Sequence, residues 1–141
     1  MTATEVPVFE STIHTTNEWL GELDQELGRS DRQQAYRIMR AVLMTLRDRL
    51  TVEEATDLGA QLPMLVRGFY YEGWNPSKTP TRERNLQAFL DHVTQYLQEP
   101  TDGDPEEAVH AVFGLLSRHV TPGEIEHVRS SLPKDVQRLW A

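Results

Sequence analysis

The sequence predicts an all-α protein, a compact helical bundle built from two tandem pseudo-equivalent units. Three observations predict this fold. Apolar residues recur at helical spacing along most of the chain. No useful length of sequence alternates Val, Ile or Thr with polar residues, as a half-buried strand would. Residues 41–70 also align without a gap on residues 111–140, 70 positions later, with these identical pairs: Ala41/Ala111, Val42/Val112, Leu46/Leu116, Thr51/Thr121, Glu54/Glu124, Leu62/Leu132, Pro63/Pro133 and Val66/Val136.

The first helix of each unit is predicted from an apolar stripe at helical spacing. Trp19, Leu20 and Leu23 in the first unit correspond to Phe89, Leu90 and Val93 in the second. In the second unit, the Thr79-Pro80 pair predicts the start of this helix, because a hydroxyl can cap it and proline is tolerated in the first turn.

The second helix of each unit begins at an aspartate. Asp31 is followed three residues later by Gln34, and Asp104 is followed directly by Pro105 and two glutamates. An aspartate cap, an early proline and first-turn carboxylates all favour the positive end of a helix. We therefore expect helices to start at both aspartates.

The third and fourth helices have the clearest start and stop signals in the sequence. Thr51-Val-Glu-Glu54 and Thr121-Pro-Gly-Glu124 both have the spacing of a capping box, in which the hydroxyl and the carboxylate satisfy each other's backbone amides. A Leu-Pro pair follows in each unit, at 62–63 and 132–133. Because proline ends one helix and can open another, each unit is expected to have three helices plus a short fourth.

The length of 141 residues suits one domain in which both units share a core. We predict a flexible N-terminus over residues 1–10 and a single helical domain over residues 11–141. Within the domain, the first unit spans residues 11–73, a linker spans 74–80, and the second unit spans 81–141.

Composition excludes several classes of function. The net charge is −8, and each half of the chain carries 7 basic and 11 acidic side chains. Without a basic patch, DNA or RNA is not an expected partner. The absence of cysteine excludes disulfides, thiolate zinc sites and thiol nucleophiles, and agrees with a reducing cytosol. With no signal-like segment and no apolar run of about 20 residues, we expect a cytoplasmic protein that does not enter a membrane.

Two Glu-x-x-His spacings are the most suggestive chemical motif. Glu107 and His110, and again Glu124 and His127, place a carboxylate and an imidazole on one helix face, as in di-iron bundles. The apolar stripes of these helices turn both pairs towards solvent, whereas ligands of a bundle metal point inward. No nucleophile motif or phosphate loop accompanies them. The sequence thus predicts no catalytic residues, no metal and no cofactor.

One aromatic-rich segment, residues 67–77, continues past the fourth helix of the first unit and has no counterpart in the second. Exposed aromatic residues beside charges are typical of binding hot spots. The alternative is that these aromatic residues fill the seam between the units. The candidate binding residues are Arg67, Tyr70, Tyr71, Glu72 and Trp74.

Two stretches carry a resemblance to a known family. Gln61-Leu-Pro-Met-Leu-Val-Arg-Gly-Phe-Tyr-Tyr-Glu-Gly-Trp-Asn-Pro76 and His119-Val-Thr-Pro-Gly-Glu-Ile-Glu-His-Val-Arg-Ser-Ser-Leu-Pro133 resemble the bacterial family called domain of unknown function 2267. The resemblance covers about residues 15 to 140. It implies an all-helical, cytosolic bacterial protein without an established activity or catalytic residue set.

A repeat of core and cap residues without a polar constellation favours a noncatalytic protein-interaction or regulatory module. Its partner would be a protein that the sequence does not identify, and homodimerisation stays open. The alternative is a helical bundle that binds a small molecule or lipid in a pocket between the two copies.

Overall fold

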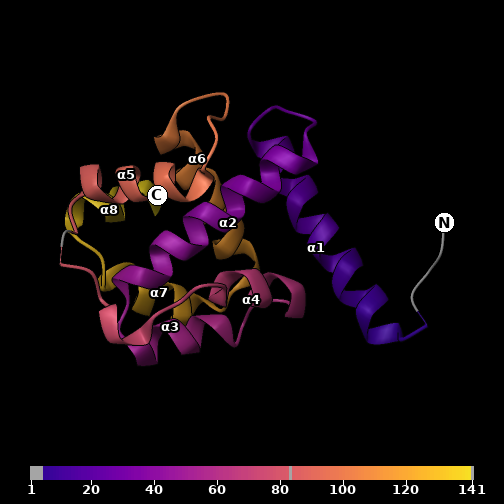
Figure 1. The fold of residues 1–141 in the computed structure, drawn as a ribbon, viewed down its shortest axis with the longest axis horizontal. Helices are drawn as coiled ribbons and strands as arrows, with labels where there is room; N and C mark the ends of the chain where they lie inside the picture. The colour runs from indigo at the N-terminus through magenta and orange to yellow at the C-terminus, as the bar shows by residue number, and fades with distance from the viewer. Residues whose placement is uncertain (1–4, 83, 141) are drawn as a thin grey trace.

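The computed structural model describes residues 5–82 and 84–140, and every regular element in these residues is helical (Figure 1). None of the helices in this part of the chain is both long enough and apolar enough to cross a membrane. The all-α prediction is confirmed. The elements in chain order are α1 (Pro7–Glu26), α2 (Arg32–Arg49), α3 (Val52–Gly59), α4 (Met64–Tyr71), the 3₁₀ turn η1 (Pro76–Lys78), α5 (Leu86–Leu97), α6 (Pro105–His119), α7 (Pro122–Ser130), α8 (Lys134–Gln137) and the 3₁₀ turn η2 (Arg138–Trp140).

Helix α2 runs through the middle of the molecule and packs against both α1 and α5 (Figure 1). Its apolar residues, such as Val42 and Leu46, are fully buried. Side chains from both predicted units join one hydrophobic cluster, which includes Val66 from α4 and Phe89 from α5. The two halves therefore share a core.

Three pairs of helix boundaries lie 70 residues apart. Helices α2 and α6 end at Arg49 and His119, and α3 and α7 begin at Val52 and Pro122. Helices α4 and α8 begin at Met64 and Lys134. These boundaries agree with a repeated helical plan, while the equivalence of the two units as three-dimensional objects stays a prediction.

The helix caps follow the sequence at three of the five predicted sites, and the exceptions are Thr121 and Thr79. The side chains of Asp31 and Asp104 accept backbone N–H groups of their own helices, and Thr51 forms the complete capping box with Glu54. The capping box predicted at Thr121 is wrong. There, the amide of Gln61 on the neighbouring unit accepts the Thr121 backbone N–H at 2.9 Å and donates to the hydroxyl oxygen at 3.0 Å.

The first helix of each unit starts elsewhere than predicted. Helix α1 begins at Pro7, so residues 7–10 of the segment predicted as a flexible N-terminus are helical, while residues 1–4 lie outside the described residues. Helix α5 begins at Leu86, where the Asn85 side chain accepts the Ala88 N–H at 2.8 Å. Thr79 instead contacts the C-terminal end of α2, where its hydroxyl donates to the Leu50 carbonyl at 2.8 Å.

Candidate interaction surface

Two of the predicted binding residues hold α4 against α3. The Arg67 guanidinium donates to the carbonyls of Gly59 and Leu62, both at 2.9 Å, and so closes the end of α3. Tyr70 is fully buried, and its hydroxyl donates to the Ala55 carbonyl at 2.7 Å. Burial raises the pKa of the Tyr70 phenol. A side chain so enclosed has no surface to offer a partner, and Tyr70 is removed from the candidate interface.

Tyr71 and Trp74 are half-buried and stack on each other, with ring centroids 5.5 Å apart. Both pack against the hydrophobic core. Tyr71 also covers Gly59 so closely that a Cβ there would lie 2.3 Å from the phenolic oxygen. Burial raises the pKa of Tyr71 as well. These contacts hold both rings against the core, while the interpretation that they fill the seam between the two units stays a prediction.

Glu72 is exposed at the end of α4. Its carboxylate lies 3.2 Å from the Arg40 guanidinium, and its backbone carbonyl accepts from Arg47 at 3.0 Å. The segment singled out in the sequence is therefore tied to α2 and α3 by internal contacts. Glu72 nevertheless borders a groove, described below.

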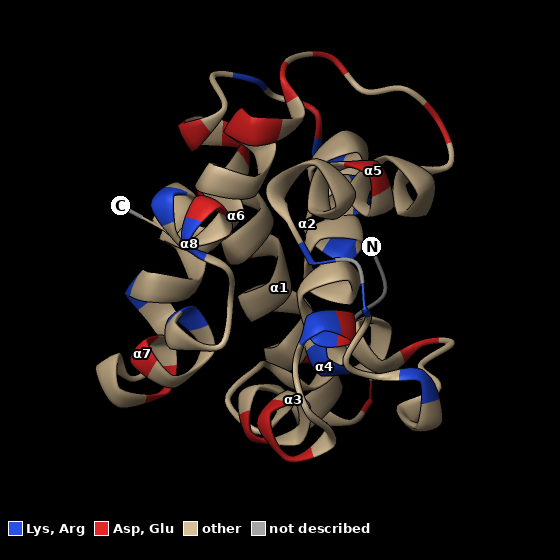
Figure 2. Cartoon of the chain, turned by 90° about the vertical axis from the view of Figure 1, so that its left-hand side faces the viewer, with Lys and Arg blue, Asp and Glu red and all other residues tan. Residues whose placement is uncertain are grey.

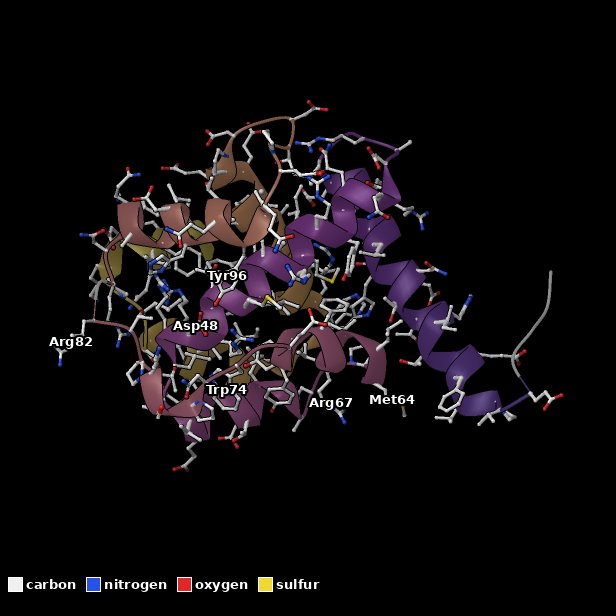
Figure 3. All side chains as sticks on the ribbon, viewed as in Figure 1. Asp48, Met64, Arg67, Trp74, Arg82 and Tyr96 are labelled. Atoms are coloured by element: carbon white, nitrogen blue, oxygen red, sulfur yellow. The ribbon has the colours of Figure 1, made fainter. Side chains whose placement is uncertain are left out.

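A polar cavity of about 500 Å³ lies where α2, the 73–81 connection and α5 meet, at the junction of the predicted units. At its wall, Arg47 is 2% exposed and lies 3.0 Å from the Asp48 carboxylate. The Tyr96 hydroxyl donates to the same carboxylate, and both residues face each other in Figure 3. Burial and this hydrogen bond raise the pKa of Tyr96. The polar groups of Arg47, Asp48 and Tyr96 thus form hydrogen bonds with one another.

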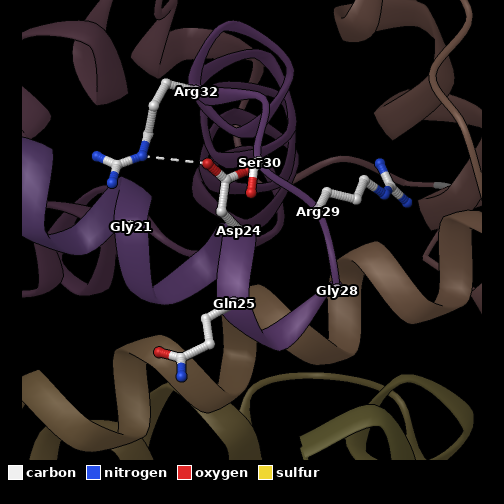
Figure 4. A pocket seen from close by; sticks show the side chains of 7 residues that line it. All are labelled: Gly21, Asp24, Gln25, Gly28, Arg29, Ser30 and Arg32. Atoms are coloured by element: carbon white, nitrogen blue, oxygen red, sulfur yellow. Dashed lines mark hydrogen bonds and ion pairs between the residues drawn. The ribbon is translucent and has the colours of Figure 1, made fainter.

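A larger hollow, of about 630 Å³, lies at the turn between α1 and α2 (Figure 4). The Asp24 carboxylate, 6% exposed as a residue, lies 3.1 Å from the Arg32 guanidinium and accepts the Asp31 backbone N–H at 3.3 Å. These contacts organise the turn and the start of α2. The charged groups of Asp24 and Arg32 in this hollow are therefore paired with each other and stabilise the turn.

The two Glu-x-x-His pairs lie on separate helices, Glu107 and His110 on α6 and Glu124 and His127 on α7. The His110 ring nitrogen lies 2.8 Å from the Leu139 carbonyl, near the C-terminal end of the described chain. Burial and the nearby Asp57 carboxylate raise the pKa of Glu124. Within residues 5–82 and 84–140, no three His, Cys, Asp or Glu side chains gather in a way that could hold a metal ion. The charges on the face shown in Figure 2 are mixed, and no single basic area dominates it.

The structure brings together an apolar surface that sequence reasoning missed. We call it the α1–α4 surface and define it by Phe9 and Ile13 on α1 and Met64 and Leu65 on α4. These side chains are 48%, 43%, 48% and 44% exposed. The N-terminal half of α1 extends beyond the rest of the molecule in Figure 1, and Met64 points outward from α4 in Figure 3. The Thr12 hydroxyl accepts the Leu65 N–H at 3.0 Å, which ties the two helices together.

A groove of about 450 Å³ lies between α1 and α4, and two of these four residues, Ile13 and Leu65, line it. Its lining includes Ile13, Leu20, Tyr36, Leu65, Gly68 and Phe69. A Cβ atom added at Gly68 would meet nothing within 4 Å, so the absence of a side chain there leaves open space. The α1–α4 surface is therefore both apolar and hollowed.

The second unit has charged residues at the matching positions. Seventy residues after Met64, Leu65 and Gly68 stand Lys134, Asp135 and Arg138. The α1 side is different too, because α5 begins at Leu86, which corresponds to residue 16, and has no equivalent of residues 7–15. The apolar surface is thus specific to the first unit.

These features define an all-helical domain that carries an apolar groove at one end. Its sequence matches the family described as Uncharacterized conserved protein (DUF2267) over residues 16–139, and the chain belongs to this family. No curated protein matches the sequence. The family match begins at residue 16, so Phe9 and Ile13 on the projecting part of α1 precede it.

Proposed function

We propose that this protein is a noncatalytic, cytoplasmic interaction module that binds an apolar segment of another protein on the α1–α4 surface. The observation that carries the proposal is the joint exposure of Phe9, Ile13, Met64 and Leu65, each 43% to 48% exposed. Contiguous exposed apolar side chains beside a groove are typical of protein interaction sites, whereas single exposed apolar residues are common everywhere.

The contact between the two helices supports the same function. The hydrogen bond between Thr12 and Leu65 ties α1 to the start of α4. An amphipathic helix is stabilised when its apolar face leaves water, and here part of that face has no partner within the described residues. A prearranged surface also loses less conformational entropy when a partner binds.

The second unit supplies the variant that tests this function. Met64→Lys with Leu65→Asp gives α4 the residues found at the start of α8, and the net charge stays at −8 because one positive and one negative charge are added. Both positions are exposed, so the fold should persist. Val52→Gln, which removes a 44% exposed apolar side chain from α3, is the matched control.

The experiment is a peptide-display selection on the purified wild-type chain, followed by binding measurements on all three proteins. We expect selected peptides to bind wild type and Val52→Gln and to lose affinity for the double variant. A selection that enriches no peptide, or peptides that bind the double variant equally well, would contradict the proposal. Analytical ultracentrifugation adds a second test. If the wild type is a dimer and the double variant is a monomer, a second copy of the chain occupies the surface.

The polar cavity between α2 and α5 favours a second candidate function, the binding of a small polar molecule. Its lining includes Lys78, His92 and Gln95, which suit a polar ligand better than a lipid. Native mass spectrometry of the protein from its own host tests this candidate. A retained mass that disappears in Lys78→Ala would support it, and an unliganded mass in both proteins would count against it.

A further inference from the structure

We propose that the partner segment is a basic amphipathic α-helix that lies along the groove between α1 and α4 and places an aliphatic side chain over Gly68. This inference rests on the proposed function of the α1–α4 surface. It specifies the shape, the charge and the anchoring position of the occupant.

The walls of the groove indicate a helical occupant. Both walls are helices, and the described residues contain no sheet edge to which an extended peptide could add a strand. Phe9 and Ile13 lie four residues apart on α1, and Met64, Leu65 and Gly68 span one turn of α4. A groove between two helices accepts the ridge of a third, whose apolar side chains recur every three or four residues.

The charge of the surroundings indicates a basic occupant. The α1 sequence Pro7–Glu26 contains five acidic side chains and neither lysine nor arginine. Glu10 and Glu18 are exposed on this helix, whereas Asp24 and Glu22 lie 3.1 Å and 3.0 Å from Arg32 and Arg118. Glu72 lines the groove but lies 3.2 Å from Arg40, and the nearby Arg67 donates to backbone carbonyls of α3, so both are already engaged. The exposed acidic charge beside the groove is therefore that of Glu10 and Glu18. Complementary charge across an interface speeds association and selects among partners.

The same charges disfavour two other occupants. A second copy would bring its own acidic α1 against this one, and like charges in close apposition oppose binding. An anionic membrane surface would be repelled for the same reason. A basic helix from a different protein meets neither obstacle.

Gly68 indicates where the occupant inserts an anchor. Glycine within a helix is unfavourable relative to alanine by about 0.5–1 kcal/mol, so its presence in the middle of α4 has a stability cost. The space above Gly68 is open, and the second unit has Arg138 at the matching position. An aliphatic side chain from the partner can fill this space and bury apolar surface on Leu65 and Phe69.

Synthetic helical peptides of about 18 residues provide the test. The first carries leucine at helical spacing and lysine elsewhere. The second replaces lysine with glutamate, and the third keeps lysine but has a proline at its centre. Fluorescence anisotropy with the full chain should show the acidic peptide and the proline peptide binding at least about tenfold more weakly than the basic peptide. Affinity for the basic peptide should fall as NaCl rises from about 0.02 M to about 0.3 M.

Three variants locate the binding site. Met64→Lys with Leu65→Asp, and separately Gly68→Arg, should weaken the basic peptide by about tenfold or more. Glu10→Gln with Glu18→Gln should weaken it less and reduce its dependence on salt. Each variant must keep the far-UV circular dichroism spectrum of the wild type, and Val52→Gln again serves as the control.

Each outcome decides a different part of the inference. Equal binding of the basic and acidic peptides would overturn the charge assignment, and equal binding of the proline peptide would overturn the helical one. Both results would leave the proposed function standing, provided that the Met64→Lys and Leu65→Asp variant still loses binding. Basic-peptide binding that survives this variant unchanged would show attraction elsewhere on the acidic surface and overturn the inference. If no synthetic or selected peptide binds, the inference and the proposed function both fail.

Discussion

Arg47 is the residue whose replacement best tests how the polar interior is held together. The side chain is 2% exposed, and its guanidinium donates to the carbonyls of Tyr70 at 2.8 Å and Glu72 at 3.0 Å. It also lies 3.0 Å from the Asp48 carboxylate. The substitution Arg47→Met keeps much of the apolar stem and removes every donor. Two carbonyls, one carboxylate and the Tyr96 hydroxyl then lose a partner.

The expected cost follows from these contacts. Hydrogen bonds to a charged group contribute about 1.5–3 kcal/mol each, and removal of one member of a buried ion pair costs about 3–5 kcal/mol. Because the contacts share one guanidinium, their energies overlap and do not add. We expect Arg47→Met to lower the free energy of unfolding by about 3–5 kcal/mol. For a chain of this length, that corresponds to a fall in Tm of about 9–15 °C.

Urea unfolding followed by far-UV circular dichroism and tryptophan fluorescence measures this loss. Arg129→Met is the control, because that guanidinium is 42% exposed and lies 3.9 Å from Glu126. An exposed pair of this kind contributes about 0–1 kcal/mol. A loss below about 1 kcal/mol for Arg47→Met would refute the reasoning, since it would place the buried network in the same range as a surface pair.

Three further predictions concern single contacts, and urea unfolding checks each of them. Gly59→Ala should destabilise the fold because its Cβ would lie 2.3 Å from the Tyr71 hydroxyl, and most of that cost should disappear in a Tyr71→Ala background. Gly68→Ala should stabilise the fold by about 0.5–1 kcal/mol, since the space is open and alanine favours a helix; a loss of stability would contradict the open geometry. Partial burial alone would raise the pKa of Glu22, but hydrogen bonds from His119 and Arg118 lower it below its ordinary value of 4.5. The lowered pKa of Glu22 stabilises the fold at pH values above 4.5, and this stabilisation is lost as the pH falls through the lowered pKa. Glu22→Gln should therefore be less stable than wild type at neutral pH and as stable as wild type in acid.

Helix ends set by local chemistry could be predicted from the sequence. Asp31 and Thr51 cap their helices through contacts within the first turn, and such contacts depend only on neighbouring residues. Thr121 could not be predicted in this way because its partner, Gln61, comes from another helix. Thr79 was misplaced for a related reason, since the carbonyl that accepts its hydroxyl lies 29 residues earlier in the chain.

The candidate site was harder to predict because composition does not reveal which face of a short helix meets the core. Tyr71 and Trp74 suggested a binding surface, yet they stack on each other and pack against the core. The surface that is exposed begins at Met64 and Leu65, which lie at the start of α4, about two turns before Tyr71. The contrast with the charged Lys134 and Asp135 was visible in the alignment of the two units, and it was the available signal for this site.

The most direct test of the central claim, that the α1–α4 surface is a binding site, is a chemical-shift map. The isotope-labelled full chain would be titrated with the basic leucine and lysine peptide and followed by two-dimensional NMR. The account predicts that the largest shifts fall on Phe9, Ile13, Leu65 and Gly68, with small changes around the polar cavity that Asp48 lines. Shifts centred on that cavity, or spread evenly over acidic residues of the whole chain, would contradict it.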